Sequence, residues 1–292
     1  MKIKISKAER VFGIFNYVIT GLLALVILVP LLNILFSSFS DPIKVMAHKG
    51  MILRPLGFTL DAYKAVARNP NILTGYRNTI FVVVVGTSLN LFLTLLGSYV
   101  LSRKNVLFNP LFTMLIVFTM YFTGGTIPFY LTVRTVGLDG TIWALIFPVA
   151  INTFNLIIMR TAMAAVPDSL PESAMIDGAT HFRVLFSIMV PLTQATLAVI
   201  TLYYAVSHWN SWFNAMIFLR DKALYPLQLI LREILIQDDT SMMTAGSGDD
   251  LGLVSETIKY ATIVVATAPI LCIYPFMQKY FVKGVMIGAV KG

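Results

Sequence analysis

Residues 11–40 read VFGIFNYVITGLLALVILVPLLNILFSSFS, a run of 30 residues without a charged side chain between Arg10 and Asp41. A helix needs about 20 predominantly apolar residues to cross the hydrocarbon layer of a membrane, so this run is long enough to span it. The run is also much longer than the apolar core of a secretory signal peptide, which has about 7–15 residues. The sequence therefore predicts an uncleaved first transmembrane helix.

Five further charge-free runs follow the first. They contain 25, 29, 20, 36 and 19 residues, at 78–102, 105–133, 140–159, 184–219 and 260–278. A backbone in lipid must satisfy its own hydrogen bonds, so each run should be helical. The fifth run counts as one span, because Pro191 lies inside it and the segment before Pro191 is amphipathic. The predicted fold class is an all-α polytopic membrane protein with six transmembrane helices.

The composition supports a membrane protein and excludes several other classes. Hydrophobic residues make up 57% and charged residues 12% of the chain, against about 25% charged residues in soluble domains. The net charge of +8 does not indicate a nucleic-acid partner, because too few polar residues remain to form a solvated basic face. The single cysteine excludes an internal disulfide framework.

The distribution of basic residues predicts the orientation. An even number of spans places both termini on one side of the membrane. The segments on that side carry 11 Lys or Arg residues in 50 positions, whereas those on the other side carry 11 in 83. Basic residues are enriched in short cytoplasmic segments, so both termini are expected in the cytoplasm.

The third run contains a helix-breaking segment, Thr123–Pro128, with two glycines and a proline. Residues 129–138 are then expected to lie along the outer surface. The break is either a packing kink or part of the lining of a transport path, and both interpretations stay open. A short helix is expected to start within Thr59–Tyr63.

No catalytic constellation is visible. The chain lacks a G-x-x-x-x-G-K-[ST] phosphate loop, so it is not expected to bind ATP by that route. The three histidines, His48, His181 and His208, are far apart in sequence and predict no metal site. The spans lack the internal charges that proton-coupled carriers generally need. We expect a protein that is not an enzyme and holds no cofactor or metal.

Residues 166–191, VPDSLPESAMIDGATHFRVLFSIMVP, predict two short cytoplasmic helices. Ser169 can cap the first, with Glu172 completing a capping box, and Gly178 is placed to end it in a left-handed conformation. Thr180 can cap the second. That second helix should carry one apolar face, formed by Phe182, Leu185, Phe186 and Met189. Such a face suits insertion into a groove on a partner protein. Alternatively, it packs against the membrane or the chain's own bundle.

The segment 172–179, ESAMIDGA, followed by Phe186 and by VPL at 190–192, resembles the E-A-A…D-G-A…P loop of binding-protein-dependent ABC importer permeases. It departs at Ser173, where the family usually has alanine, and at Ala195, where proline is frequent. The stretches 124–128, 154–160 and 208–214 resemble the carbohydrate branch of the family, notably permeases for oligosaccharides released from polysaccharides. Residues 288–292, GAVKG, are similar to the tail of the maltose-importer permease that enters the ATPase dimer interface.

The resemblance implies the type I ABC importer permease fold and a multi-pass location in a bacterial plasma (inner) membrane. It implies four kinds of partner: a second, usually non-identical permease, two ATPase subunits that hold ATP and Mg, an extracytoplasmic solute-binding protein, and a carbohydrate substrate. The stretch 238–250 could reach the binding protein. The expected ATPase contacts are Glu172, Ser173, Ala174, Asp177, Gly178, Ala179 and Phe182. Closure of the ATPases would move this loop and switch the access of the pore.

Residues 208–214, HWNSWFN, are candidates for the substrate path, because aromatic faces stack on sugar rings and amides bond to hydroxyls. The alternative, which we favour, is structural: Trp is enriched at membrane interfaces, and Asn and His bond between helices. The candidate path residues are Tyr204, His208, Trp209, Asn210, Trp212 and Asn214.

The predicted organisation has three parts. Residues 1–76 form the first helix and an external segment, residues 77–282 form a core of five spans with the loop 166–191, and residues 283–292 form a cytoplasmic tail. The predicted function is the permease subunit of an ATP-driven carbohydrate importer, in which ATPase closure is coupled to alternating access. The rival interpretations are an ion-coupled secondary carrier and a membrane scaffold without transport activity.

Overall fold

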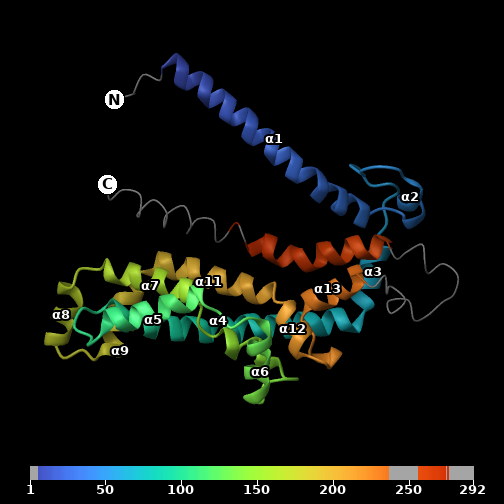
Figure 1. The fold of residues 1–292 in the computed structure, drawn as a ribbon. Coiled ribbons are helices and arrows are strands. Elements are labelled where there is room, and N and C mark those ends of the chain that lie inside the picture. The colour runs from blue at the N-terminus through green and yellow to red at the C-terminus, as the bar shows by residue number, and fades with distance from the viewer. Residues whose placement is uncertain (1–5, 237–255, 274, 276–292) are drawn as a thin grey trace. The chain divides into compact units, whose positions relative to one another are not determined.

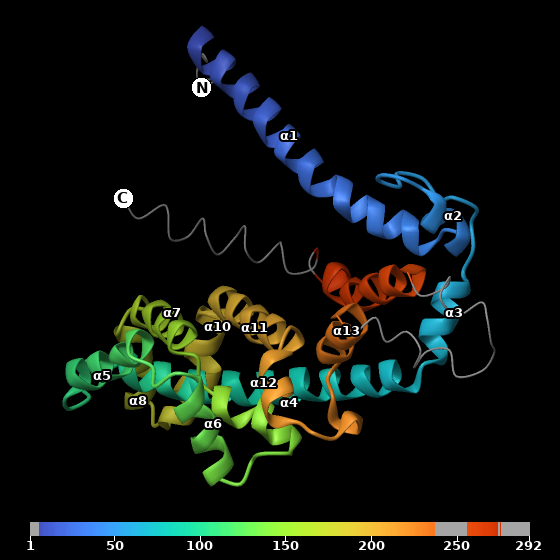
Figure 2. The ribbon, with the colours of Figure 1, turned by 45° about the vertical axis from the view of Figure 1, so that its right-hand side comes forward.

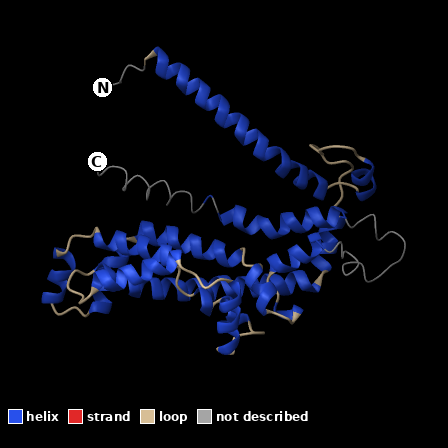
Figure 3. Ribbon diagram, viewed as in Figure 1, coloured by secondary structure: helices blue, strands red, loops and turns tan. Residues whose placement is uncertain are grey.

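The computed structural model describes residues 6–236, 256–273 and 275, and within these ranges the chain is helical (Figure 3), with one isolated bridge between Ser40 and Phe58. It divides into two compact units, Met1–Pro70 with Glu233–Thr267 and Asn71–Arg232 with Ala268–Gly292. The predicted stretch 238–250 and tail 283–292 lie outside the described residues. The predicted division of the chain at residue 76 stays a prediction.

The first unit contains the long helix α1, Lys7–Ser38. A capping box starts it: the Glu9 N–H donates to the Ser6 hydroxyl, and the Ser6 N–H donates to the Glu9 carboxylate at 2.7 Å. None of the residues in its most apolar window is buried. An apolar surface of this length needs lipid or another chain against it.

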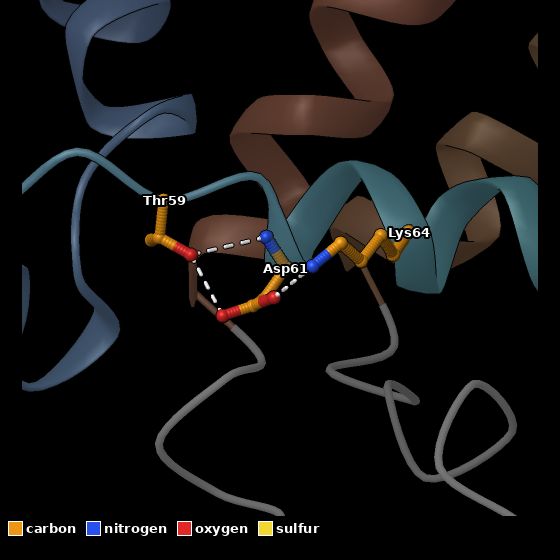
Figure 4. Close-up of polar contacts among 3 residues, drawn as sticks. All are labelled: Thr59, Asp61 and Lys64. Atoms are coloured by element: carbon orange, nitrogen blue, oxygen red, sulfur yellow. Dashed lines mark hydrogen bonds and ion pairs between the residues drawn. The ribbon is translucent and has the colours of Figure 1, made fainter.

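Two short helices follow α1 in the first unit. Asp41 caps α2, Pro42–Ala47, which the sequence analysis missed. Helix α3, Asp61–Arg68, confirms the start expected within Thr59–Tyr63. Figure 4 shows Asp61 between Thr59 and Lys64, at 2.7 Å from the hydroxyl and 2.9 Å from the ammonium. The hydrogen bond from Thr59, followed by the contact with Lys64, holds the pKa of the exposed Asp61 carboxyl below its usual value.

The second unit is organised around α4, Pro70–Ser102, a helix of 33 residues that runs the length of this unit (Figure 2). At about 1.5 Å per residue it is about 50 Å long. Helix α4, α1 and the helix Glu256–Ile273 are each long and apolar enough to cross a membrane alone.

Three further candidate spans are broken helices. Helix α5, Asn109–Tyr121, meets α6, Thr126–Thr135, at 115°, and α6 projects from the bundle in Figure 1. The 3₁₀ turns Ile142–Leu145 and Phe147–Val149 meet α7, Thr153–Ala164, at 45°. The helical segment His181–Leu192 meets α11, Gln194–Trp209, at 89°. The described residues therefore hold up to six spans, and the break predicted at Thr123–Pro128 is confirmed.

Two of the buried clusters in the second unit are built on α4. One cluster joins Leu95 and Tyr99 of α4 to Met159 and Met163 of α7 and to Leu185 and Met189. The other joins Val82 of α4 to Leu145, Ile146, Ala215, Leu219 and Leu229. Helix α12, Phe213–Phe218, lies within the predicted fifth run but is separate from α11. Helix α13, Leu227–Ile236, whose residues divide between the two units, was not predicted.

A seam of buried polar side chains runs along α4. Asn78 donates to the carbonyls of Ala223 and Tyr225, and Asn90 donates to the carbonyl of Val149 at 2.6 Å. A broken helix leaves backbone groups unpaired, and lipid offers no partner for them. The α4 seam therefore supplies hydrogen bonds at the places where the neighbouring chain is interrupted.

Candidate functional site

The segment 166–191 forms two helices, α8, Ser169–Ile176, and α9, His181–Val184. The predicted capping box at Ser169 is wrong: Asp168 occupies the N-cap position, and no side chain caps this end. The physical reason is that Asp168 already has helical backbone angles, φ −59° and ψ −28°, so Ser169 lies inside the helix. The Asp168 carboxylate pairs with the Lys104 ammonium at 2.7 Å rather than with the helix end.

The turn between the helices follows the local rules of the sequence. Gly178 has a φ of +85°, which confirms the left-handed cap. Its N–H donates to the Met175 carbonyl, and the N–H of Ala179 donates to the Ala174 carbonyl at 2.9 Å. Thr180 caps α9 by accepting the N–H of Arg183, as predicted. An extra side chain at Gly178 would meet open space but would be strained by the backbone angle.

The predicted single apolar face of the second helix is wrong. Leu185 and Met189 are buried, whereas Phe182 and Phe186 are 63% and 44% exposed. A π-helical turn, Leu185–Met189, accounts for the different burial of Phe186 and Met189. A π turn bonds residue i to i+5 and changes the angular spacing of the side chains. The α-helical period used for the prediction does not apply there.

The residues expected at the ATPase contact lie on a loop with one side exposed and the other side packed against the bundle. Glu172, Ser173, Asp177, Gly178 and Phe182 are exposed. Ala174 and Ala179 are half-buried and pack, with Met175, against the cluster around Tyr99 and Met189. Their role in binding an ATPase stays a prediction.

Ile176 was missed by the sequence reasoning. It is 86% exposed at the end of α8, which is unusual for a large apolar side chain. The signal in the sequence is its position next to Asp177 and Gly178, at the tip of the predicted turn.

A cavity of about 800 Å³ separates the loop from the end of α4 and the turn that follows it. Two contacts bridge the two sides. Tyr99 Oη and His181 Nδ1 share a hydrogen bond of 3.0 Å, and Lys104 pairs with Asp168. On the α4 side, the Arg103 guanidinium lies over the Tyr99 ring. The hydrogen bond with Lys104 lowers the pKa of the Asp168 carboxyl and raises the pKa of Lys104. These contacts tie α8 and α9 to the α4–α5 turn.

The candidate path residues are divided between the interior and the surface. Three of them lie between helices. His208 Nε2 is 2.7 Å from Asn90 Oδ1. Tyr204 Oη is 2.8 Å from Thr94 Oγ1 and accepts the N–H of Asn152. Trp209 is buried, with its ring edge-on to Tyr76.

The other three path residues lie around the end of α11. Asn210 is exposed, Asn214 is half-buried, and the Arg232 guanidinium lies 4.4 Å from the centre of the Trp212 ring. The role of all six residues in substrate binding stays a prediction. Within residues 6–236 and 256–273, no group of three or more His, Cys, Asp or Glu side chains could hold a metal ion.

Comparison with known proteins places this architecture in a family. Residues 104–287, more than half of the chain, match the family described as "binding-protein-dependent transport system inner membrane component". The chain belongs to this family. The permease is therefore a component of membrane transport rather than an enzyme, and it is a multi-pass protein of the plasma membrane.

Two relatives from Bacillus subtilis (strain 168) are similar over nearly their whole length. The permease is 42% identical to Protein LplC over 98% of this chain and 97% of that protein. It is 41% identical to the polygalacturonan/rhamnogalacturonan transport system permease protein YtcP over 97% of this chain and 99% of that protein.

A solved structure shows the same fold. It is a chain in the crystal structure of a bacterial ABC transporter involved in the import of the acidic polysaccharide alginate, at 33% identity and a TM-score of 0.86. The match covers 96% of this permease and 100% of that chain. The predicted fold class, an all-α type I ABC importer permease, is confirmed.

Proposed function

We propose that this permease is the membrane-spanning subunit of an ATP-driven importer for an oligosaccharide. Its similarity to YtcP and to the alginate importer chain supports this proposal, because both matches extend over almost all of each chain. Both names refer to polysaccharides, and alginate is described as acidic. An oligosaccharide that carries carboxylates, such as trigalacturonate, is therefore the substrate that we propose to test first.

The proposed complex has the partners that the family resemblance implies. A second permease, two ATPase subunits with ATP and Mg, and an extracytoplasmic solute-binding protein would complete it. The absence of a phosphate loop from the sequence supports a separate ATPase. The unburied apolar surface of α1 supports an additional membrane partner. In the proposed orientation, both chain termini lie in the cytoplasm.

The loop formed by α8 and α9 would transmit force from the ATPase to the spans. The observation that carries this proposal is the contrast between its two sides. Ile176 and Phe182 are exposed large apolar side chains on the outer side, while Ala174, Met175 and Ala179 pack into the bundle on the inner side. A surface anchored in this way moves with the bundle when a partner displaces it.

Gly178→Arg tests this role. The new side chain meets open space within the chain, so its bulk and charge would act on the partner. The complex should hydrolyse ATP and reach the membrane at the normal level, but trigalacturonate uptake should fall roughly tenfold or more. Uptake in vesicles and ATP hydrolysis are measured on the same preparation.

Two controls separate the partner contact from backbone strain. Gly178→Asn keeps a residue that tolerates the left-handed conformation and should retain most of the uptake. Gly137→Arg introduces the same side chain at another glycine with positive φ and open surroundings, in the α6–Ile142 connection, and should transport normally. If Gly178→Arg transports as well as Gly137→Arg, the loop does not couple the ATPase to the pore.

A further inference from the structure

The length of α5 implies that the connection between α5 and α6 lies within the thickness of the membrane. Helix α5 starts at Asn109, shortly after the charged turn at Arg103 and Lys104, and ends at Tyr121. Thirteen helical residues rise about 20 Å at 1.5 Å each, whereas the hydrocarbon layer is about 30 Å thick. Helix α6 then leaves at 115°. The chain is therefore interrupted before it can reach the far side of the layer.

The interrupted segment presents unpaired polar groups. Residues 121–128 are all exposed. The N–H groups of Thr123–Ile127 have no acceptor among the residues that the structure describes, and neither do the hydroxyls of Thr123 and Thr126. Lipid cannot satisfy such groups, so irregular backbone at this depth must face water, a polar ligand or another chain. A packing kink inside this chain would instead bury them.

The shape and chemistry of the segment favour a ligand over a second chain. An open hollow of about 530 Å³ is lined by Thr123–Thr126, Pro128, Phe129 and Thr132, within the range of about 300–1,000 Å³ typical of small-molecule sites. Directly before it, Tyr121 and Phe122 are 77% and 65% exposed, and the Phe122 ring stacks on Phe118 at 4.1 Å. Flat aromatic faces beside free hydroxyls and amides are the groups that bind the apolar face and the hydroxyls of a sugar.

We propose that Tyr121–Thr126 and Thr132 form an oligosaccharide subsite on the transport path, an inference that rests on the proposed function. The aromatic rings stack on a sugar ring, and the Thr and Gly groups bond to its hydroxyls. No charged side chain lines the hollow. The subsite therefore recognises the sugar ring and its hydroxyls, and the carboxylates of an acidic oligosaccharide are held elsewhere.

Cysteine labelling tests the subsite in the complete importer. The single native cysteine allows a Cys272→Ser background. Thr123→Cys should react with a charged maleimide in membrane vesicles of both orientations, and trigalacturonate should slow the reaction several-fold. Phe112→Cys, at an exposed site on α5, is the matched control and should stay unlabelled in lipid. If Thr123→Cys is unlabelled, or is labelled at the same rate with trigalacturonate present, the subsite is overturned.

Transport measurements separate this inference from the proposed function. The variant Thr123→Val/Thr126→Val removes two hydroxyls at almost constant shape and should raise the apparent KM for trigalacturonate uptake several-fold, at an unchanged level in the membrane. Tyr121→Ala should do the same, and Tyr121→Phe, which keeps the ring, should not. Wild-type vesicles that take up no trigalacturonate overturn the proposed function. Active wild-type vesicles with unchanged variants overturn only the subsite.

Discussion

Gly86 of α4 lies directly against the imidazole of His208 from α11. A Cβ atom added at Gly86 would be 2.6 Å from His208 Nε2. The ring cannot turn away freely, because the same nitrogen is 2.7 Å from Asn90 Oδ1. Gly86, His208 and Asn90 therefore pack as one unit. The hydrogen bond between His208 and Asn90 holds the imidazole against the backbone of Gly86.

Gly86→Ala should destabilise the protein. Overpacking a well-packed interior costs about 1–3 kcal/mol, and the higher helix propensity of alanine offsets about 1 kcal/mol of it. Thermal unfolding of the purified complex in detergent should show a lower midpoint. Gly13→Ala in α1 is the control, because its added Cβ meets open space. A variant at Gly86 as stable as the one at Gly13 would contradict the packing described here.

Predictions at single residues were correct where the conformation depends on the residue's own turn, and wrong where a residue distant in sequence takes part. Gly178 and Thr180 were predicted because a left-handed cap and an N-cap need only their own turn. The start of α8 was predicted wrongly, because Asp168 rather than Ser169 occupies the N-cap position, and Lys104, distant in sequence, binds its carboxylate. Tyr204 and His208 were recognised as polar aromatic residues in a span, but their partners on α4 could not be inferred from one sequence.

Among the elements, α4 differs from its neighbours by being unbroken. Its side chains form hydrogen bonds to the backbone where neighbouring helices break. Thr94 acts indirectly, by bonding to the Tyr204 hydroxyl. The Tyr204 hydroxyl bonds to Thr94 and accepts the N–H of Asn152, the N-cap residue of α7. This one hydroxyl thus links three elements at the start of a broken span.

Tyr204→Phe should therefore destabilise the fold by about 1–3 kcal/mol, because it leaves the buried hydroxyl of Thr94 and the part-buried N–H of Asn152 without their shared partner. The unfolding midpoint of the purified complex measures the effect. Tyr17→Phe is the matched control, since the Tyr17 side chain is highly exposed on α1, and its midpoint should not change. Equal midpoints for the two variants would show that the Tyr204 hydroxyl is not needed to close the break.

The lengths of the charge-free runs predicted the spans, but not their interruptions. The break at Thr123–Pro128 was visible because two glycines and a proline disfavour helix. The bend before α7 was not predicted, although Pro148 and the N-cap Asn152 are signals for it. Helix α13 was missed because Arg232 and Glu233 interrupt its apolar pattern, in which Leu227, Leu231 and Ile234 share one face.

For the whole molecule, the arrangement across the membrane decides whether the proposed mechanism is possible. The loop with Ile176 must face the cytoplasm to meet an ATPase, and the α6–Ile142 connection must then be accessible to water from the outside. The sequence supports this orientation only through the density of basic residues. A direct measurement of sidedness therefore tests the mechanism.

Two exposed aliphatic residues allow that measurement. Ile176→Cys and Val136→Cys, each in a Cys272→Ser background, replace side chains that are exposed in the free chain. In intact cells a membrane-impermeant maleimide should label Val136→Cys, whereas Ile176→Cys should react only after the membrane is permeabilised. Co-expressed ATPase subunits should then slow labelling of Ile176→Cys and leave Val136→Cys unaffected. The reverse pattern would place the loop outside, beyond the reach of any ATPase, and the coupling proposal would fail with it.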